Sequence, residues 1–269
     1  MRRSIYIALG CLLLTANDSF GQTPELITDR PDQTESTAIV PPKYFQVESG
    51  YTLTQDEALD ETAQTHEFPG TLIRAGIIDG IEGRLGWGGY TWEDNLDTNV
   101  RVDGGSDIDV GAKIHLLEEQ GIVPQSALML TVALPTGSAA FTSDRVDPAF
   151  RFTMSHTLSE RLSLGYNLGT SWVSSLNEDN DDLEQSAVFN YTTSLGISVT
   201  EKLGMFVEVF GDVPVNGRGR PQNSFDGGFT YKIKPNLQLD TSAGVGLSEE
   251  ANDFFVGAGI SVLWPNDRS

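Results

Sequence analysis

The chain has 269 residues, and its 17 lysines and arginines against 38 aspartates and glutamates give a formal net charge of −21 at pH 7. Such an acidic chain repels polyanions, so nucleic acid is not an expected partner. Hydrophobic residues still make up 39 % and there are 28 glycines, a composition that argues against disorder and favours short β-strands.

The first 21 residues have the pattern of a secretory signal peptide. Arg2 and Arg3 form a positive start, residues 5–14 an apolar run, and small residues precede a cleavage site before Gln22. A lipoprotein signal at Cys11 is the alternative. Cys11 is the only cysteine, so the mature chain is expected to lack disulfides and thiolate metal sites.

Residues 22–42 contain a charged stretch, LITDRPDQTES, from Leu26 to Ser36. It is too charged for a core strand, and its proline bars an ordinary helix interior. It nevertheless lacks the low complexity of a linker. Its role depends on the structure that follows it.

From Lys43 onward, apolar and polar residues alternate in twelve segments of about 9–13 residues, a length that suits a tilted strand across a bilayer. In residues 161–172, leucines, Tyr166 and Trp172 share one face, and serines, glycines and Asn167 the other. The segments begin near Lys43, Phe68, Ile81, Asp107, Ser126, Pro148, Glu160, Ser186, Lys202, Asn223, Asn236 and Asp253. No stretch of the mature chain is apolar for long enough to form a membrane-spanning helix, so any span must be β.

The connections between these segments alternate in length. Short ones lie at residues 79–80, 159–160, 200–201 and 234–236, and long ones mostly at 55–67, 93–106, 135–147, 174–185 and 212–222. Lipid offers no hydrogen bonds, so a spanning sheet must close on itself. We therefore predict an all-β fold: a closed antiparallel transmembrane β-barrel of about 12 strands over residues 43–264, with short periplasmic turns, long extracellular loops and a C-terminal tail at 265–269. A soluble β-sandwich or lipocalin-like barrel is the alternative.

Parity within each strand assigns the faces, because charges at mid-strand are costly against lipid. The residues predicted to line the lumen are Glu48, Arg74, Glu82, Arg84, Asp109, Lys113, His115, Arg151, Glu208, Asp226 and Asp240. Tyr51, Trp87, Trp172 and Trp264 fall near strand ends, as in an interfacial aromatic girdle.

The opening of the mature chain, ITDRPDQTEST followed by VPPKYFQVESGY, closely resembles the outer-membrane transporter family named for a meta-pathway of phenol degradation. The resemblance is specific at this end and generic along the barrel. It implies a porin-like channel in the bacterial outer membrane, linked to uptake of aromatic or hydrophobic compounds.

A twelve-stranded barrel gives the charged stretch a candidate role as a plug, because its lumen is too wide for small side chains alone to close. We expect Asp29, Arg30, Pro31, Asp32 and Glu35 to enter the lumen. Arg30 would then pair with an inward carboxylate, Asp29 or Asp32 with an inward arginine, and the segment would run extended. A disordered periplasmic leader is the alternative.

The leading functional prediction is passive transport of a small solute, with membrane lipids, lipopolysaccharide and the barrel-assembly machinery as further partners. A non-conducting structural or adhesive barrel is the first alternative. A lipase-like barrel enzyme is the second, but Ser155 and His156 are adjacent and so point to opposite faces. The acidic run at residues 177–184 lacks calcium-loop spacing, and no catalytic residue, metal site or cofactor is expected.

Overall fold

The computed structural model describes residues 24–58, 61–176, 182–215 and 219–265. The predicted signal peptide, Cys11, most of the acidic run at 177–184 and most of the tail after Trp264 lie outside these residues. Within the described ranges, no helix is long and apolar enough to cross a membrane.

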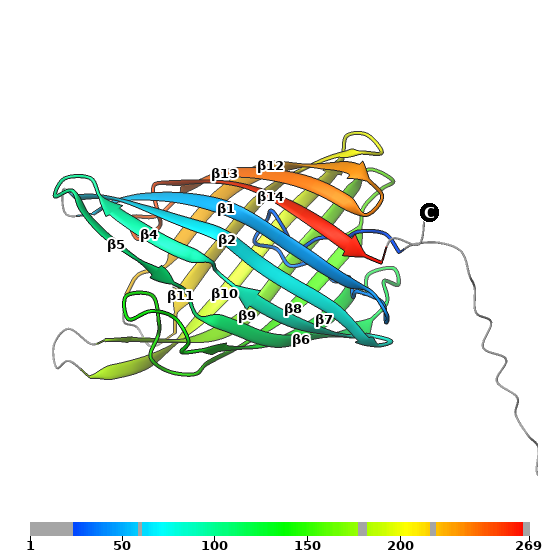
Figure 1. The fold of residues 1–269 in the computed structure, drawn as a ribbon. Coiled ribbons are helices and arrows are strands. Elements are labelled where there is room, and N and C mark those ends of the chain that lie inside the picture. Colours follow the sequence, from blue (N-terminus) through cyan, green and yellow to red (C-terminus); the bar gives the residue numbers. More distant parts are fainter. Residues whose placement is uncertain (1–23, 59–60, 177–181, 216–218, 266–269) are drawn as a thin grey trace, which may run out of the picture.

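The described chain forms one antiparallel sheet of fourteen strands (Figure 1). The strands are β1 (Phe45–Ala58), β2 (Glu61–Ile78), β3 (Ile81–Trp87), β4 (Tyr90–Asn95), β5 (Val100–Gly105), β6 (Ile108–Leu117), β7 (Gln125–Leu134), β8 (Asp147–Thr157), β9 (Leu162–Leu176), β10 (Leu183–Ser198), β11 (Leu203–Pro214), β12 (Gln222–Lys234), β13 (Leu237–Gly246) and β14 (Phe254–Trp264).

Two pairs of these strands are halves of longer ones. Gly88 and Gly89 separate β3 from β4, and β2 pairs with both halves. Ser106 and Asp107 separate β5 from β6, which pair with β4 and β3 respectively. Counting each pair as one strand gives the twelve strands predicted from the alternation.

The sheet closes because β1 pairs with β2 on one side and β14 on the other. The β1–β14 register runs from Phe45 opposite Trp264 to Gln55 opposite Phe254. The predicted closure of the first strand on the last is therefore confirmed, and the two-sheet alternative is wrong.

The short turns lie at the predicted positions, but two of the predicted long loops are largely strand. β1 continues to Ala58 and β2 begins at Glu61, and β4 and β5 fill most of residues 93–106. The first stretch is polar on both faces, and in the second the alternation of Val100 and Val102 with Arg101 and Asp103 is only four residues long, so neither carries a strand signal of membrane-spanning length. Backbone pairing needs no apolar face once the strands leave the bilayer, which is why the hairpins continue there.

Burial in this protein is inverted relative to a soluble domain. The fully buried side chains are mostly polar and include Glu48, Arg74, Glu82 and Lys113, whereas exposed ones include Leu85, Val110, Leu130, Phe152 and Phe229. A small apolar cluster of Leu26, Val40 and Leu263, packed against Tyr44, ties the N-terminal segment to the barrel wall. A lipid-facing exterior around a polar interior explains this distribution.

Candidate functional site: the N-terminal segment in the barrel lumen

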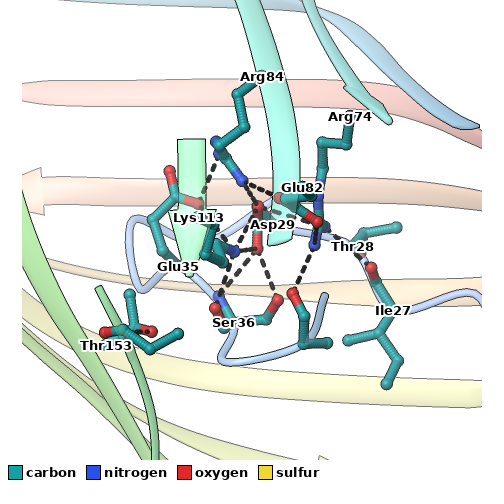
Figure 2. A network of polar contacts seen from close by, with 12 residues as sticks. Ile27, Thr28, Asp29, Glu35, Ser36, Arg74, Glu82, Arg84, Lys113 and Thr153 are labelled. Atoms are coloured by element: carbon teal, nitrogen blue, oxygen red, sulfur yellow. Dashed lines mark hydrogen bonds and ion pairs between the residues drawn. The ribbon is translucent and has the colours of Figure 1, made fainter. Parts of the chain in front are cut away.

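Residues 24–42, called the N-terminal segment below, lie inside the barrel rather than beside it (Figure 1). The first anchor of this segment is Asp29 (Figure 2). Its Oδ2 lies 2.7 Å from Arg84 Nη1, 3.1 Å from Lys113 Nζ and 3.2 Å from Arg74 Nη1. These cations come from β3, β6 and β2, so one carboxylate joins three strands.

Further carboxylates complete this buried network. Glu82 holds Arg74 through two bonds of 3.0 and 3.1 Å, and Glu48 lies 3.2 Å from the same guanidinium. Glu35 reaches Arg84 at 2.9 Å. Desolvating so many charges is costly, and it is offset only because each charge has a close partner of opposite sign.

The segment does not run extended, which corrects the expectation from Pro31. The backbone N–H and the hydroxyl of Ser36 both donate to Asp29 Oδ1, at 2.9 and 2.7 Å. The stretch therefore folds back into a compact loop closed by one of its own carboxylates. A proline constrains its neighbours' dihedrals, but it does not dictate where a chain reverses.

Arg30 is seated on the opposite side of this loop. Its Nη2 lies 3.1 Å from Asp240 Oδ1 on β13, and its backbone N–H donates to Glu48 at 2.9 Å. The guanidinium rests on Gly50 and Gly259, which face each other across β1 and β14. A Cβ on either glycine would overlap Arg30, so this pair forms a notch that only glycines can provide.

The rest of the loop binds the far wall. Gln33 N–H donates to Glu208 Oε2 at 2.7 Å, and the Thr34 hydroxyl is hydrogen-bonded to Glu208 Oε1 and to the hydroxyl of Thr192. Glu35 and Asn167 exchange two hydrogen bonds of 2.7 and 3.1 Å. The segment is thus attached to walls on both sides of the lumen.

An excess of negative charge lies where the loop meets β11 and β12. Glu208 and Asp226 are directly opposite each other in the β11–β12 register, and both are buried. Asp32 lies beside them. Among the described residues, neither oxygen of Asp226 has a hydrogen-bond partner. Two buried carboxylates this close repel each other when both are ionised.

A cavity lies on each side of the segment. The one toward the extracellular loops has a volume of about 290 Å³, and its lining includes Glu35, Arg84, Asp109, Met129 and Arg151. The one toward the periplasmic turns has a volume of about 210 Å³ and is lined by Ile27, residues 38–41 of the segment and the barrel wall. The N-terminal segment therefore separates two internal spaces.

The predicted lumen residues divide into two groups in the structure. Those near the segment are buried: Glu48, Arg74, Glu82, Arg84, Lys113, Glu208, Asp226 and Asp240. Asp109 and Arg151 line the larger cavity, and His115 Nε2 lies 3.2 Å from Glu118 near the periplasmic turns. Sequence reasoning did not single out the uncharged partners Gln46, Asn167, Thr192 and Gln238 as site residues, although strand parity assigns them to the same face.

The extracellular mouth has its own anchored loop. Asp107 accepts N–H bonds from Thr136 at 2.9 Å, Gly137 at 2.8 Å and Ser143 at 2.9 Å, so it fastens residues 135–146 to the β5–β6 joint. Burial by itself would raise the pKa of Asp107, but these donors outweigh it and lower the pKa below its ordinary value. No pattern in the sequence predicts this contact.

The described residues contain no group of three His, Cys, Asp or Glu side chains arranged to hold a metal ion. Ser155 bonds to Thr37 inside the lumen at 2.9 Å. His156 stacks on Tyr166 of the neighbouring strand, and its Nδ1 lies 3.7 Å from Glu119. The adjacent serine and histidine thus have separate partners and no mutual contact is recorded.

Comparison with solved structures finds outer-membrane barrels. The COG4313 outer membrane channel from Pseudomonas putida F1 is 11 % identical, with 84 % of this chain and 97 % of that chain covered and a TM-score of 0.65. The NanC porin is 10 % identical, with coverages of 81 % and 98 % and a TM-score of 0.53. At these identities the likeness establishes the fold alone. Those neighbours are channels and porins rather than enzymes.

Curated proteins give no significant match to the chain. A family model does match, from residue 28 in the charged stretch to residue 264 at the end of β14. The matched range thus covers nearly all of the described chain, including most of the N-terminal segment as well as the barrel. The chain belongs to the family described as "Putative MetA-pathway of phenol degradation".

Proposed function

We propose that this protein is a passive channel for small solutes, including aromatic or hydrophobic ones, in which the N-terminal segment narrows and gates the pore. The observation that carries the proposal is the attachment of one polar loop to opposite walls, through Asp29 on one side and Gln33–Glu35 on the other. A cavity lies on each side of this loop, as expected for a pathway that a gate interrupts.

The family description supports the solute class, since it refers to phenol degradation. The similar P. putida protein is itself an outer-membrane channel. The contacts of the segment are hydrogen bonds and ion pairs, which can exchange with water. Its periplasmic end is held by the apolar cluster of Leu26, Val40 and Leu263, by a hydrogen bond from Val40 N–H to Glu82 and by the ion pair of Glu25 with Lys232. This arrangement suits a gate that loosens without detaching from the barrel.

Location in the bacterial outer membrane would bring the protein into contact with further partners. The exposed apolar belt would contact membrane lipid and, in the outer leaflet, lipopolysaccharide. Export would use residues 1–21 as signal peptide, and insertion would use the barrel-assembly machinery.

The decisive experiment is single-channel recording in planar bilayers with the full chain and with residues 28–35 deleted. We expect a small conductance for the full chain and a several-fold larger one for the deletion. Heat-modifiable migration on a gel checks that the deleted protein still forms a barrel. A folded deletion variant that conducts no better than the full chain would contradict the gate, and two silent barrels would favour a structural or adhesive role.

A further inference from the structure

The larger cavity contains one cation that differs from the others in the lumen. Arg30, Arg74, Arg84 and Lys113 each lie within 4.0 Å of a carboxylate. For Arg151, on β8, no such pair occurs among the described residues. Its recorded hydrogen bond is a long one, 3.5 Å from Nη1 to the carbonyl oxygen of Gln33. Its guanidinium therefore keeps most of its five donors for another partner.

The surroundings of Arg151 are mixed in character. Leu72 and Met129 line the same cavity and supply apolar surface, while Ser171 and Asn190 supply neutral hydrogen-bonding groups. Arg84 and Glu35 also line it, but they pair with each other at 2.9 Å. The volume of about 290 Å³ is at the lower end of pockets that hold small organic molecules.

We propose that this cavity binds a small organic monoanion, in which a carboxylate pairs with Arg151 and an apolar ring or short chain packs on Leu72 and Met129. A guanidinium donates two parallel hydrogen bonds to the two oxygens of a carboxylate, which favours such a head group over a neutral hydroxyl or an amine. The proposal rests on the proposed channel function, because it names the class of solute that would occupy the cavity on the extracellular side of the N-terminal segment.

Asp109 opposes this site. It lines the same cavity, and like Arg151 it has no ion pair recorded among the described residues. A carboxylate there repels an anionic solute and would limit its affinity. Weak binding suits a channel, because the solute must leave again. Neutralising Arg151 should therefore weaken the binding of an anion, and neutralising Asp109 should strengthen it. Opposite effects of the two changes would distinguish a specific site from a general effect of mutation.

The test is isothermal titration of the purified, detergent-solubilised full chain with three probes of similar size: benzoate, benzyl alcohol and benzylamine. We expect benzoate to bind most tightly, with an affinity about tenfold or more above that of benzyl alcohol, because only benzoate can form a charge-assisted bidentate pair with Arg151. A tenfold difference in affinity corresponds to about 1.4 kcal/mol. R151Q should weaken benzoate binding by a similar factor, R151K should weaken it less, and D109N should strengthen it. R161Q, at an exposed position in the turn before β9, is the matched control and should leave the affinity unchanged.

Equal benzoate affinity in the wild type and R151Q, no benzoate binding in the wild type, or tighter binding of benzylamine would each overturn the proposal. Heat-modifiability shows that each variant is folded. The channel function can fail independently of the site. If the barrel binds benzoate through Arg151 but does not conduct with or without residues 28–35, the binding site is supported and the channel function is contradicted.

Discussion

Arg30 and Asp240 form an ion pair of 3.1 Å between positions 210 residues apart, with the Asp240 side chain fully buried. The pair links the N-terminal segment to β13 through a notch made by Gly50 and Gly259. It is the contact that brings the segment against the part of the wall where β1 closes on β14.

The glycine notch makes the first prediction. In G259A the three atoms nearest to the added methyl group would all belong to the flexible side chain of Arg30, so the barrel wall should form while Arg30 is displaced. We expect a higher single-channel conductance. R30A should raise it to a similar level, and the double variant should add little, because both changes remove the same contact.

G257A is the matched control, two residues earlier on the same face of β14. Its nearest new contact would be Ser242 Oγ at 3.1 Å, which a rotamer change relieves. Conductance should stay at the wild-type level. An effect of G257A as large as that of G259A would show that the wall, not Arg30, is responsible.

The Asp29 network makes the second prediction. D29N removes the charge that three cations share, and leaves Arg74, Arg84 and Lys113 with fewer buried partners. Breaking a buried ion pair on one side costs about 3–5 kcal/mol, so we expect a clearly lower apparent melting temperature in detergent and a more open pore. D94N, at the exposed Asp94–Arg101 pair, is the control and should barely change either quantity. A D29N melting temperature equal to that of the wild type would contradict the role of Asp29 as the main anchor.

Asp226 makes a third prediction, with the opposite sign. D226N replaces a buried carboxylate that faces Glu208 by a neutral amide, whose N–H groups can donate to Glu208. We expect stabilisation by about 1–3 kcal/mol at neutral pH, the usual cost of an unsatisfied buried polar group. Thermal unfolding measures it, with D253N at an exposed position as the comparison. If D226N is less stable than the wild type, this carboxylate has a favourable partner that the present contacts do not include.

Asp107 makes a pH prediction. Its pKa is lowered when residues 135–146 are bound, so the anchoring of this loop is fully present above the ordinary pKa of about 4. It should be lost as the pH falls through the lowered value. Protection of the amides of residues 135–146 from hydrogen exchange, relative to the intrinsic rate at each pH, should therefore be high at pH 7 and fall on strong acidification. D107N should exchange fast at pH 7, whereas D144N, within the same loop, should not. Slow exchange in D107N would refute the anchor.

The barrel itself was predictable from the sequence because its signal is local. A strand between lipid and a polar lumen alternates with period two, and one residue of slip would expose its charges, so parity alone places Glu48, Arg74 and Lys113 on one face. The same reasoning predicted the turn positions and the closure of β1 on β14. It failed at residues 55–67, where both faces are polar, and at residues 93–106, where apolar and polar residues alternate only from Val100 to Asp103.

The sequence by itself therefore determined the strand count, the two faces and the charged character of the N-terminal segment. Only the tertiary structure decided which charge meets which. Asp29 reaches cations on β2, β3 and β6, and Arg30 fits between two glycines from the first and last strands. Such contacts depend on barrel closure and register, which bring distant positions together. The fold-back through Ser36 was hidden for the same reason, since a loop in a lumen takes the shape that satisfies its buried polar groups.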